Sequence, residues 1–436
     1  MFYSWLPMLL IVAGSLVIGR AITRACGQEK WWGIEPAVGF AALMAVEGLL
    51  ARVPGTKAAL IAGLLALTAA SVWVLRKPGR DDLPGSVFFW VAGLVAALIL
   101  TIPFAVTGHW GLLGMGYNND LGLHLAWAEW LRSGFGTEPS DGYPLGPHGL
   151  VAALSTIPDF ALGRVFIAQV AAIAVLTVMT AWAAVEPLGR WRRLLAAVLV
   201  GLPYLMVSYY AQAAFKELAT AMFLLAFVIA LPRLTPLPPE RRFRAVFPLL
   251  VLLLGIIFTY SFPGLAWPAA ALLAWLLADP DFRTRLHPRA VWAWLKRPAV
   301  WISLVVGLGL VAALAFLGPF GFGDAFSEVA ASNAFGPVSV LEGLGIWLTS
   351  DYRLAGNLDR WPPDLPEGAS WGVGSVVRDS LPIDARLHAV DFSDNYRVLV
   401  GRDVAEKGRL RELLAEGMAW SAAAAVFFAL MGAAVL

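Results

Sequence analysis

The residues whose types and spacing are best suited to chemistry lie between Gly116 and Leu150. Asp120 and His124 stand four positions apart there, at the start of a segment with apolar residues at helical intervals. Side chains four apart leave the same face of a helix, so a helix over 120–133 would hold a carboxylate and an imidazole together. Such groups can remove a proton from a substrate hydroxyl. Asp120 and His124 are therefore the predicted catalytic residues.

A second histidine follows at a turn. Tyr143 precedes Pro-Leu-Gly-Pro and His148, and His148 opens an apolar run over 149–158. This run is too short to cross a bilayer, so we expect it to enter the membrane edge and return. The turn would then bring Tyr143 and His148 near the catalytic pair, where we expect both to bind substrate.

Simpler interpretations stay open for these residues. In one of them, Asp120 acts only as a helix N-cap, which contributes about 1 kcal/mol to stability. In another, His124 is a packing residue whose ring is hydrogen-bonded. Asp120, His124 and His148 would alternatively bind a divalent metal, since carboxylates and imidazoles suit such ions. The segment lacks a tight ligand pair of the metalloprotease type, so we predict no metal and no cofactor.

The elements that must position these residues are transmembrane helices. Of the 436 residues, 59% are hydrophobic and only 14% are charged, against about 25% charged in an average soluble chain. Apolar runs bounded by charge predict an all-α polytopic membrane protein with about eleven spans. Their approximate bounds are 4–19, 34–51, 58–75, 86–107, 163–183, 194–209, 214–231, 245–260, 264–278, 299–317 and 418–436. The 120–133 helix, in the first large external loop, would lie along the membrane interface.

Charge predicts the orientation of these spans. Five alternate connections (20–33, 76–85, 184–193, 232–244 and 279–298) hold eighteen of the 32 Lys and Arg residues. The four short or medium connections on the other side (52–57, 108–147, 210–213 and 261–263) hold only Arg52, Lys57 and Arg132. The basic set is therefore cytoplasmic and the N-terminus extracytoplasmic in a multi-pass protein of the cell membrane. A net charge of +2 excludes a nucleic-acid partner, and the single Cys26 excludes a disulfide framework.

Five parts follow from this map. They are a four-helix block (1–107), an extracytoplasmic loop with its interfacial helix (108–162), a six-helix core (163–317), an extracytoplasmic region (318–417) and a last span (418–436). The 318–417 region holds nine basic and fifteen acidic residues. Its turns and short alternating stretches fit either a small mixed α/β domain or an extended cap.

Polar residues also gather at the predicted outer ends of the spans. Lys216 begins the span at 214–231, Tyr260 precedes a very short turn, and Arg353 follows Asp351-Tyr352 in the late external region. Lys216 is either a ligand for a substrate phosphate or a lysine that extends to the interface. We expect Lys216, Tyr260 and Arg353 to bind substrate together with Tyr143 and His148.

The segment from Asp120 through His124 to Tyr143 and His148 resembles the GT-C superfamily of membrane glycosyltransferases, and in particular actinobacterial members. Those enzymes carry an acidic residue in the first extracytoplasmic loop, as base or metal ligand. The chain departs from their pattern in two ways. Four spans precede the loop instead of one, and Asn118-Asn119-Asp120 holds one acid instead of a pair.

The resemblance implies a hexosyl- or pentosyltransferase. Its donor would be a polyprenyl-phosphate-linked sugar, its acceptor an extracytoplasmic glycan, lipid or protein, and its base Asp120, with inversion at the anomeric carbon. Membrane lipid would surround it. The alternative is a polytopic transporter or flippase of a lipid-linked or polar substrate, and a non-catalytic assembly protein is a further rival.

Overall fold

The computed structural model describes residues 2–278, apart from gaps at 54, 77–83, 108–119, 135–138, 140–142, 158–159, 204–205, 207–209, 211–212, 235–236 and 238. The predictions for 299–317, 318–417 and 418–436 lie outside the described residues. The chain divides into two compact units, and most described residues belong to the first, made of 1–111, 124–201 and 215–331. The second unit is described only over 120–123 and at a few residues of 202–214.

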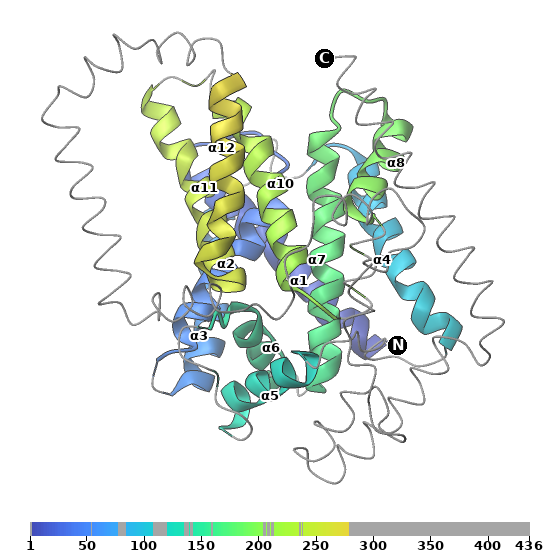
Figure 1. Ribbon diagram of the computed structural model, residues 1–436, viewed down its shortest axis with the longest axis vertical. Coiled ribbons are helices and arrows are strands. Elements are labelled where there is room, and N and C mark those ends of the chain that lie inside the picture. The colour runs from blue at the N-terminus through green and yellow to red at the C-terminus, as the bar shows by residue number, and fades with distance from the viewer. Residues whose placement is uncertain are drawn as a thin grey trace, which may run out of the picture. The chain divides into compact units, whose positions relative to one another are not determined.

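All regular structure in the described residues is helical, as the sequence predicts (Figure 1). The helices are α1 (Phe2–Ala25), α2 (Glu35–Leu50), α3 (Thr56–Leu75), α4 (Val87–Thr107), α5 (Asp120–Ser133), α6 (Gly146–Thr156), α7 (Leu162–Ala184), α8 (Arg190–Gly201), α10 (Lys216–Leu234), α11 (Pro239–Tyr260), the short 3₁₀ helix η1 (Phe262–Leu265) and α12 (Ala266–Ala278).

Four of the described helices are long and apolar enough to cross a membrane, at Trp5–Ala25, Thr56–Leu75, Leu162–Ala184 and Lys216–Leu234. Each coincides with a predicted span. The helix α7 is completely buried along its apolar length and packs against α1, α2, α4, α6, α8 and α10. The total of about eleven spans stays a prediction, because two of them lie outside the described residues.

The helix α8 differs from the span predicted at 194–209. It begins at Arg190 and ends at Gly201, shortly before Pro203. Proline ends helices because it lacks an amide proton and its ring clashes with the preceding turn. Twelve residues extend about 18 Å, which is too short for a hydrocarbon core of about 30 Å. The continuous apolar composition of 194–209 concealed this break.

Three connections predicted to lie on the same side of the membrane meet at one end of the described helices. They are 20–33, 184–193 and 232–244. Gly33 lies against Ala183 at the end of α7. Arg233, near the end of α10, forms an ion pair with Glu186 at 3.2 Å. The helices α5 and α6 lie at the opposite end, near the start of α7 (Figure 1). Which end faces the cytoplasm stays a prediction.

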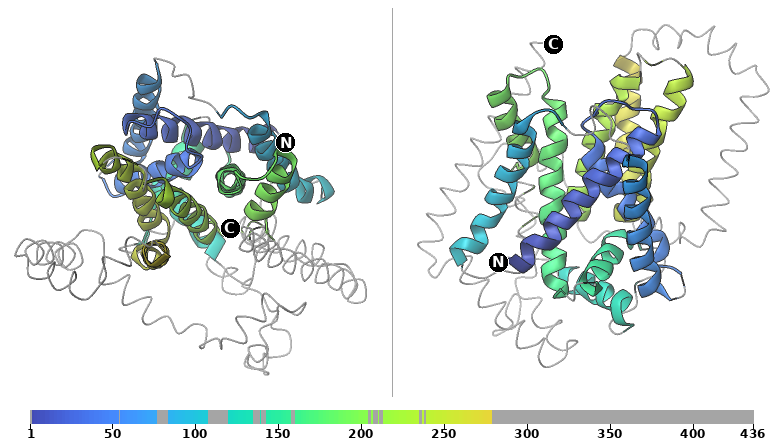
Figure 2. Two further views of the ribbon diagram at one scale, coloured as in Figure 1. Left: turned by 90° about the horizontal axis from the view of Figure 1, so that it is seen from above. Right: turned by 180° about the vertical axis from the view of Figure 1, so that it is seen from behind.

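The close crossing of α1 and α2 is the tightest contact between two long helices of this unit, and Figure 2 shows both helices from two further sides. A Cβ atom at Gly19 would overlap the backbone of Glu35, and one at Gly39 would overlap the carbonyl of Ser15. Small residues at four-residue spacing allow two helices in a membrane to approach at backbone distance. The crossing therefore depends on glycine at both positions.

Cysteine labelling tests the sidedness. In a Cys26→Ser background, Asp141→Cys should react with an impermeant maleimide added outside intact cells, because 108–162 is predicted to be extracytoplasmic. Arg241→Cys should react only after the membrane is opened. Reaction of both cysteines from one side would contradict the map.

Replacement of each of two glycines of α1 by alanine tests whether the α1–α2 crossing depends on glycine. Gly19→Ala should lower the thermal midpoint of the purified protein, since overpacking of this kind costs about 1–3 kcal/mol. Gly14 provides the matched control, because a Cβ there meets no atom within 4 Å. Gly14→Ala should leave the midpoint unchanged or raise it, since alanine favours helix. Equal midpoints for the two variants would refute the proposed dependence.

Candidate functional site

The helix α6 is seated directly on the backbones of its neighbours. A Cβ atom at Gly146 would lie 2.5 Å from the carbonyl oxygen of Met44 and 2.8 Å from that of Phe258. A Cβ at Gly149 would lie 3.1 Å from Glu47. Only glycine allows such approach. The backbone of α6 is therefore held between α2 and α11, and its remaining side chains, His148 included, are fixed by that position.

The helix α5 turns a different face inward from the one the sequence predicts. The apolar residues at helical intervals are Leu121, Leu125, Ala128 and Leu131, of which Ala128 and Leu131 are buried and Leu125 is only partly buried. His124 and Trp127 complete the buried face. His124 therefore lies in the protein interior, which agrees with the interpretation of this residue as a hydrogen-bonded packing residue. In Figure 1 α5 lies beside the start of α7, and its place in the membrane interface stays a prediction.

The chain between α5 and α6 is anchored before the second histidine. Arg52, in the turn after α2, donates a hydrogen bond of 2.7 Å to the backbone oxygen of Tyr143. Apolar side chains of α3, α5 and α6 pack beside this bond in one cluster, made of Ala51, Leu60, Leu131, Leu145, Ala152 and Ala153, with Tyr143 at its edge.

The structure brings His124 and His148 together. The Nδ1 atom of His124 lies 3.1 Å from the Nε2 atom of His148, within hydrogen-bond distance. His148 has no solvent exposure and His124 only 6%. In such a bond between two neutral imidazoles, one ring donates its single N–H proton and the other accepts it with a bare nitrogen, so the accepting ring carries its own proton on its second nitrogen. The tautomers of His124 and His148 are consequently linked.

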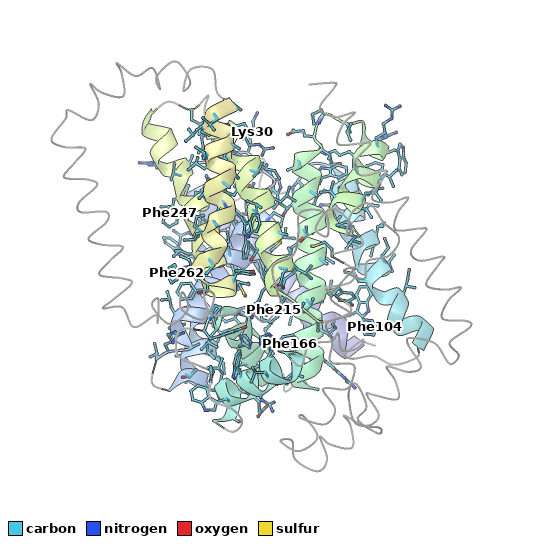
Figure 3. All side chains as sticks on the ribbon, in the orientation of Figure 1. Lys30, Phe104, Phe166, Phe215, Phe247 and Phe262 are labelled. Carbon is cyan, nitrogen blue, oxygen red and sulfur yellow. The ribbon has the colours of Figure 1, made fainter. Side chains whose placement is uncertain are left out.

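Aromatic rings surround this histidine pair. His124 lies 4.9 Å from Phe215 and 6.4 Å, stacked, from Phe166, measured between ring centroids. Trp127 and Tyr143 contact each other at 4.2 Å, and both contact the two histidines. Figure 3 labels Phe166 and Phe215, which reach the cluster from α7 and from the start of α10. Four separate segments of chain thus enclose the pair.

Lys216 brings a positive charge to the same cluster. Its Nζ atom lies 4.5 Å from the ring centroid of Tyr143, in the geometry of a cation–π contact. Burial, and then the charge of Lys216, lower the pKa of His124 to about 3. Burial, His124 and Lys216 hold the pKa of His148 well below its usual range. Both imidazoles are therefore neutral at pH 7, and Lys216 carries the charge.

For the other three predicted site residues, Asp120, Tyr260 and Arg353, the structure gives less detail or none. Asp120 is the first residue of α5, one turn before His124, and its side chain lies outside the described part of the chain. Tyr260 ends α11 within electrostatic range of Glu217, the neighbour of Lys216. Arg353 lies outside the described residues. His124, His148, Tyr143 and Lys216 thus form one cluster in the structure.

Sequence reasoning missed several members of this cluster. Trp127, Phe166 and Phe215 belong to apolar or interfacial stretches, where an aromatic residue carries no distinguishing signal. Glu47 was visible as a lone acid in an apolar helix, and the structure places it against α6 at Gly149. Glu47 is fully buried, and neither of its carboxyl oxygens has a hydrogen-bond partner among the described residues. A buried acid of this kind is costly unless it has a function.

Two further polar atoms of the cluster are buried without a hydrogen-bond partner in the described part of the chain, namely Nδ1 of His148 and Nε1 of Trp127. Unsatisfied buried groups are uncommon in native proteins and mark places where water or ligand binds. As for metals, the described residues contain no group of three or more His, Cys, Asp or Glu side chains able to hold an ion.

Comparisons of the chain with protein-family models, with curated proteins and with solved structures find no match. A function is therefore proposed below from the residues of the chain themselves.

The neutral state of the histidine pair predicts how stability depends on pH. An unfolded chain, with histidine pKa values of about 6.5, binds more protons than the folded chain once the pH falls below that value. The pair's contribution is thus complete above about pH 6.5 and decreases below it, by about 1.4 kcal/mol per pH unit for each imidazole. Thermal midpoints measured from pH 7.5 to pH 5 should fall accordingly.

A His148→Phe variant should show a shallower fall in the midpoint over the same range, because one titrating imidazole is gone. Trp127→Phe is the matched control, since it alters the same aromatic cluster and removes no titratable group. It should keep the steep dependence of the original chain. Identical slopes in all three proteins would rule out this explanation.

Proposed function

We propose that the protein is a membrane glycosyltransferase of the GT-C type. It transfers a sugar from a polyprenyl-phosphate carrier to an acceptor outside the cytoplasm, with inversion at the anomeric carbon. The observation that carries the proposal is the buried His124–His148 pair, which is one helical turn from Asp120 on α5 and shares its cluster with Lys216.

The reaction needs a base, and Asp120 fills this role. Its carboxylate accepts the proton of the acceptor hydroxyl, and the hydroxyl oxygen attacks the anomeric carbon from the face opposite the carrier. The bond between that carbon and the phosphate oxygen breaks, and the phosphate keeps the electron pair. Phosphate is a good leaving group, so a carboxylate of ordinary basicity suffices once it is positioned.

The histidine pair supports the base through its position. His124 is almost completely buried and held by His148 and four aromatic rings. Its backbone is thereby fixed, and with it the first turn of α5, where Asp120 stands. His124 is accordingly a positioning residue in this mechanism. A base must be held within hydrogen-bond reach of the proton that it removes.

Lys216 stabilises the departing phosphate. Negative charge grows on the carrier phosphate as the bond to the sugar breaks, and a fixed cation stabilises that charge most where water is scarce. Lys216 is suited to this because both imidazoles beside it are uncharged. Tyr143 and Tyr260, from chain segments at the same end of the bundle, and Arg353 complete the proposed substrate-binding set.

A transporter or flippase is the second candidate, and Glu47 is the observation that favours it. Buried acids inside helical membrane proteins commonly mark substrate or proton paths. Glu47 is fully buried, with neither carboxyl oxygen hydrogen-bonded to a described residue. Its contact with α6 at Gly149 places it beside the helix that carries His148, so a role in the transferase site is equally consistent with its position.

Turnover of a carrier-linked sugar separates the two functions. Purified protein in lipid vesicles should release polyprenyl phosphate from a labelled polyprenyl-phosphate hexose or pentose. Asp120→Asn should reduce this release by a factor of about 10²–10⁴, the usual contribution of a general base. Lys216→Met should also reduce it.

Glu129→Gln is the matched control, because Glu129 is an acid on the same helix that forms a half-buried ion pair with Arg132 at 2.7 Å. It should turn over at the rate of the original chain. Full activity in Asp120→Asn, or movement of the intact carrier across the vesicle membrane without sugar release, would argue against the transferase.

A further inference from the structure

Two exposed arginines stand beside an aromatic pair where α4 and α8 begin. Arg190 lies over the ring of Phe88, with its Cζ atom 5.6 Å from the ring centroid. Phe88 contacts Trp191 edge-on at 4.7 Å. Arg190 and Arg192 are both exposed, as is Trp191. The starts of the two helices thus form a basic and aromatic surface at one end of the bundle.

Neither exposed arginine is neutralised by an acid of the described residues. Glu186, which lies in the turn between α7 and α8, forms its ion pair with Arg233 at 3.2 Å. Arg193 is engaged internally, since it donates a 2.8 Å hydrogen bond to the backbone oxygen of Trp182 and lies over its ring. Arg190 and Arg192 form no ion pair within the described part of the chain. This surface therefore presents two positive charges available to an external anion.

Apolar stripes lead away from these charges along both helices. Large exposed side chains recur every four residues on each helix, at Trp90, Leu94, Leu98 and Ile102 of α4 and at Trp191, Leu195 and Leu199 of α8. The two helices pack against each other and lie side by side in Figure 1. We call this surface, from the arginines to the ends of the stripes, the α4–α8 seam.

The length of α8 fits one leaflet of a bilayer. Twelve residues extend about 18 Å, close to half of a hydrocarbon core of about 30 Å. An amphiphile with its charged group at Arg190 and Arg192 would have its apolar chains beside the stripes over one leaflet. A soluble acidic protein or a nucleic acid would match the charges but would leave the stripes uncovered.

We infer that the α4–α8 seam binds an anionic glycerophospholipid, with its phosphate headgroup at Arg190 and Arg192 and its acyl chains along the two stripes. Basic residues at a membrane surface attract anionic lipid, and the aromatic rings beside them suit the headgroup region. The charge asymmetry of the chain predicts that this end is cytoplasmic, and the lipid then belongs to the inner leaflet. The seam is therefore separate from the proposed transferase site.

Native mass spectrometry of the full chain tests the inference. Detergent-purified protein is titrated with dioleoyl phosphatidylglycerol and, in parallel, with dioleoyl phosphatidylcholine. The anionic lipid should bind more tightly. Arg190→Gln and Arg192→Gln should each weaken its binding about fivefold, the effect expected of one basic residue near a membrane surface, and should leave phosphatidylcholine binding unchanged.

Lys57→Gln is the matched control, because it removes one exposed charge in the first turn of α3. It should bind both lipids as the original chain does. All three changed residues are exposed, and equal thermal midpoints verify that the variants are folded. Equal binding of the two lipids to the original chain would overturn the inference, as would an equal loss in Lys57→Gln.

Two competitors test whether the whole lipid is recognised. Dihexanoyl phosphatidylglycerol, with the same headgroup and short chains, should bind more weakly than the dioleoyl lipid, because it covers less of the stripes. Inorganic phosphate at 10-fold molar excess over the lipid should leave the lipid bound. Equal affinity of the two chain lengths, or displacement by phosphate, would identify a site for free anions and refute the lipid site.

Discussion

The close packing of the α6 backbone against α2 and α11 is the constraint on which the arrangement of the candidate site depends. Because Gly146 and Gly149 have no side chains, the backbone of α6 reaches the carbonyls of Met44 and Phe258 and the Cβ of Glu47. This approach carries His148 into the interior, where it has no solvent exposure. A polar ring there needs a partner, and His124 supplies one at 3.1 Å. The burial of α6 thereby determines the position of α5.

Charge is distributed unevenly around this arrangement. Two imidazoles that would be partly protonated in water are neutral, because burial and Lys216 both disfavour their charged forms. The histidine pair therefore contributes hydrogen-bonding capacity without competing with Lys216 for an anion. A substrate phosphate would meet one cation among aromatic rings and uncharged nitrogens, an environment in which a single charge acts strongly because little water screens it.

The sequence predicts well what depends on short spacing and composition. Helices α1, α2, α3, α4, α7, α10, α11 and α12 follow from apolar runs, and α5 follows from the pattern after Asp120. It predicts poorly what depends on contacts between distant segments. His124 and His148 are 24 residues apart, Phe166 comes from α7 and Phe215 from the residue before α10, so no local pattern indicates their cluster. The burial of His124, which the sequence left as one of two interpretations, depends on the same kind of contact, because the neighbouring helices decide which face of α5 is buried.

The two ends of the bundle illustrate opposite uses of the same residue types. Near α5 and α6, aromatic rings enclose neutral histidines, and one lysine contacts a tyrosine ring. Near the starts of α4 and α8, aromatic rings stand beside arginines that remain exposed. Enclosure excludes water, so the electrostatic interaction of each charge with a ligand is strong and specific. Exposure to water weakens that interaction, which suits a ligand that is present in excess. The first arrangement favours chemistry on a scarce substrate, and the second favours attachment to abundant lipid.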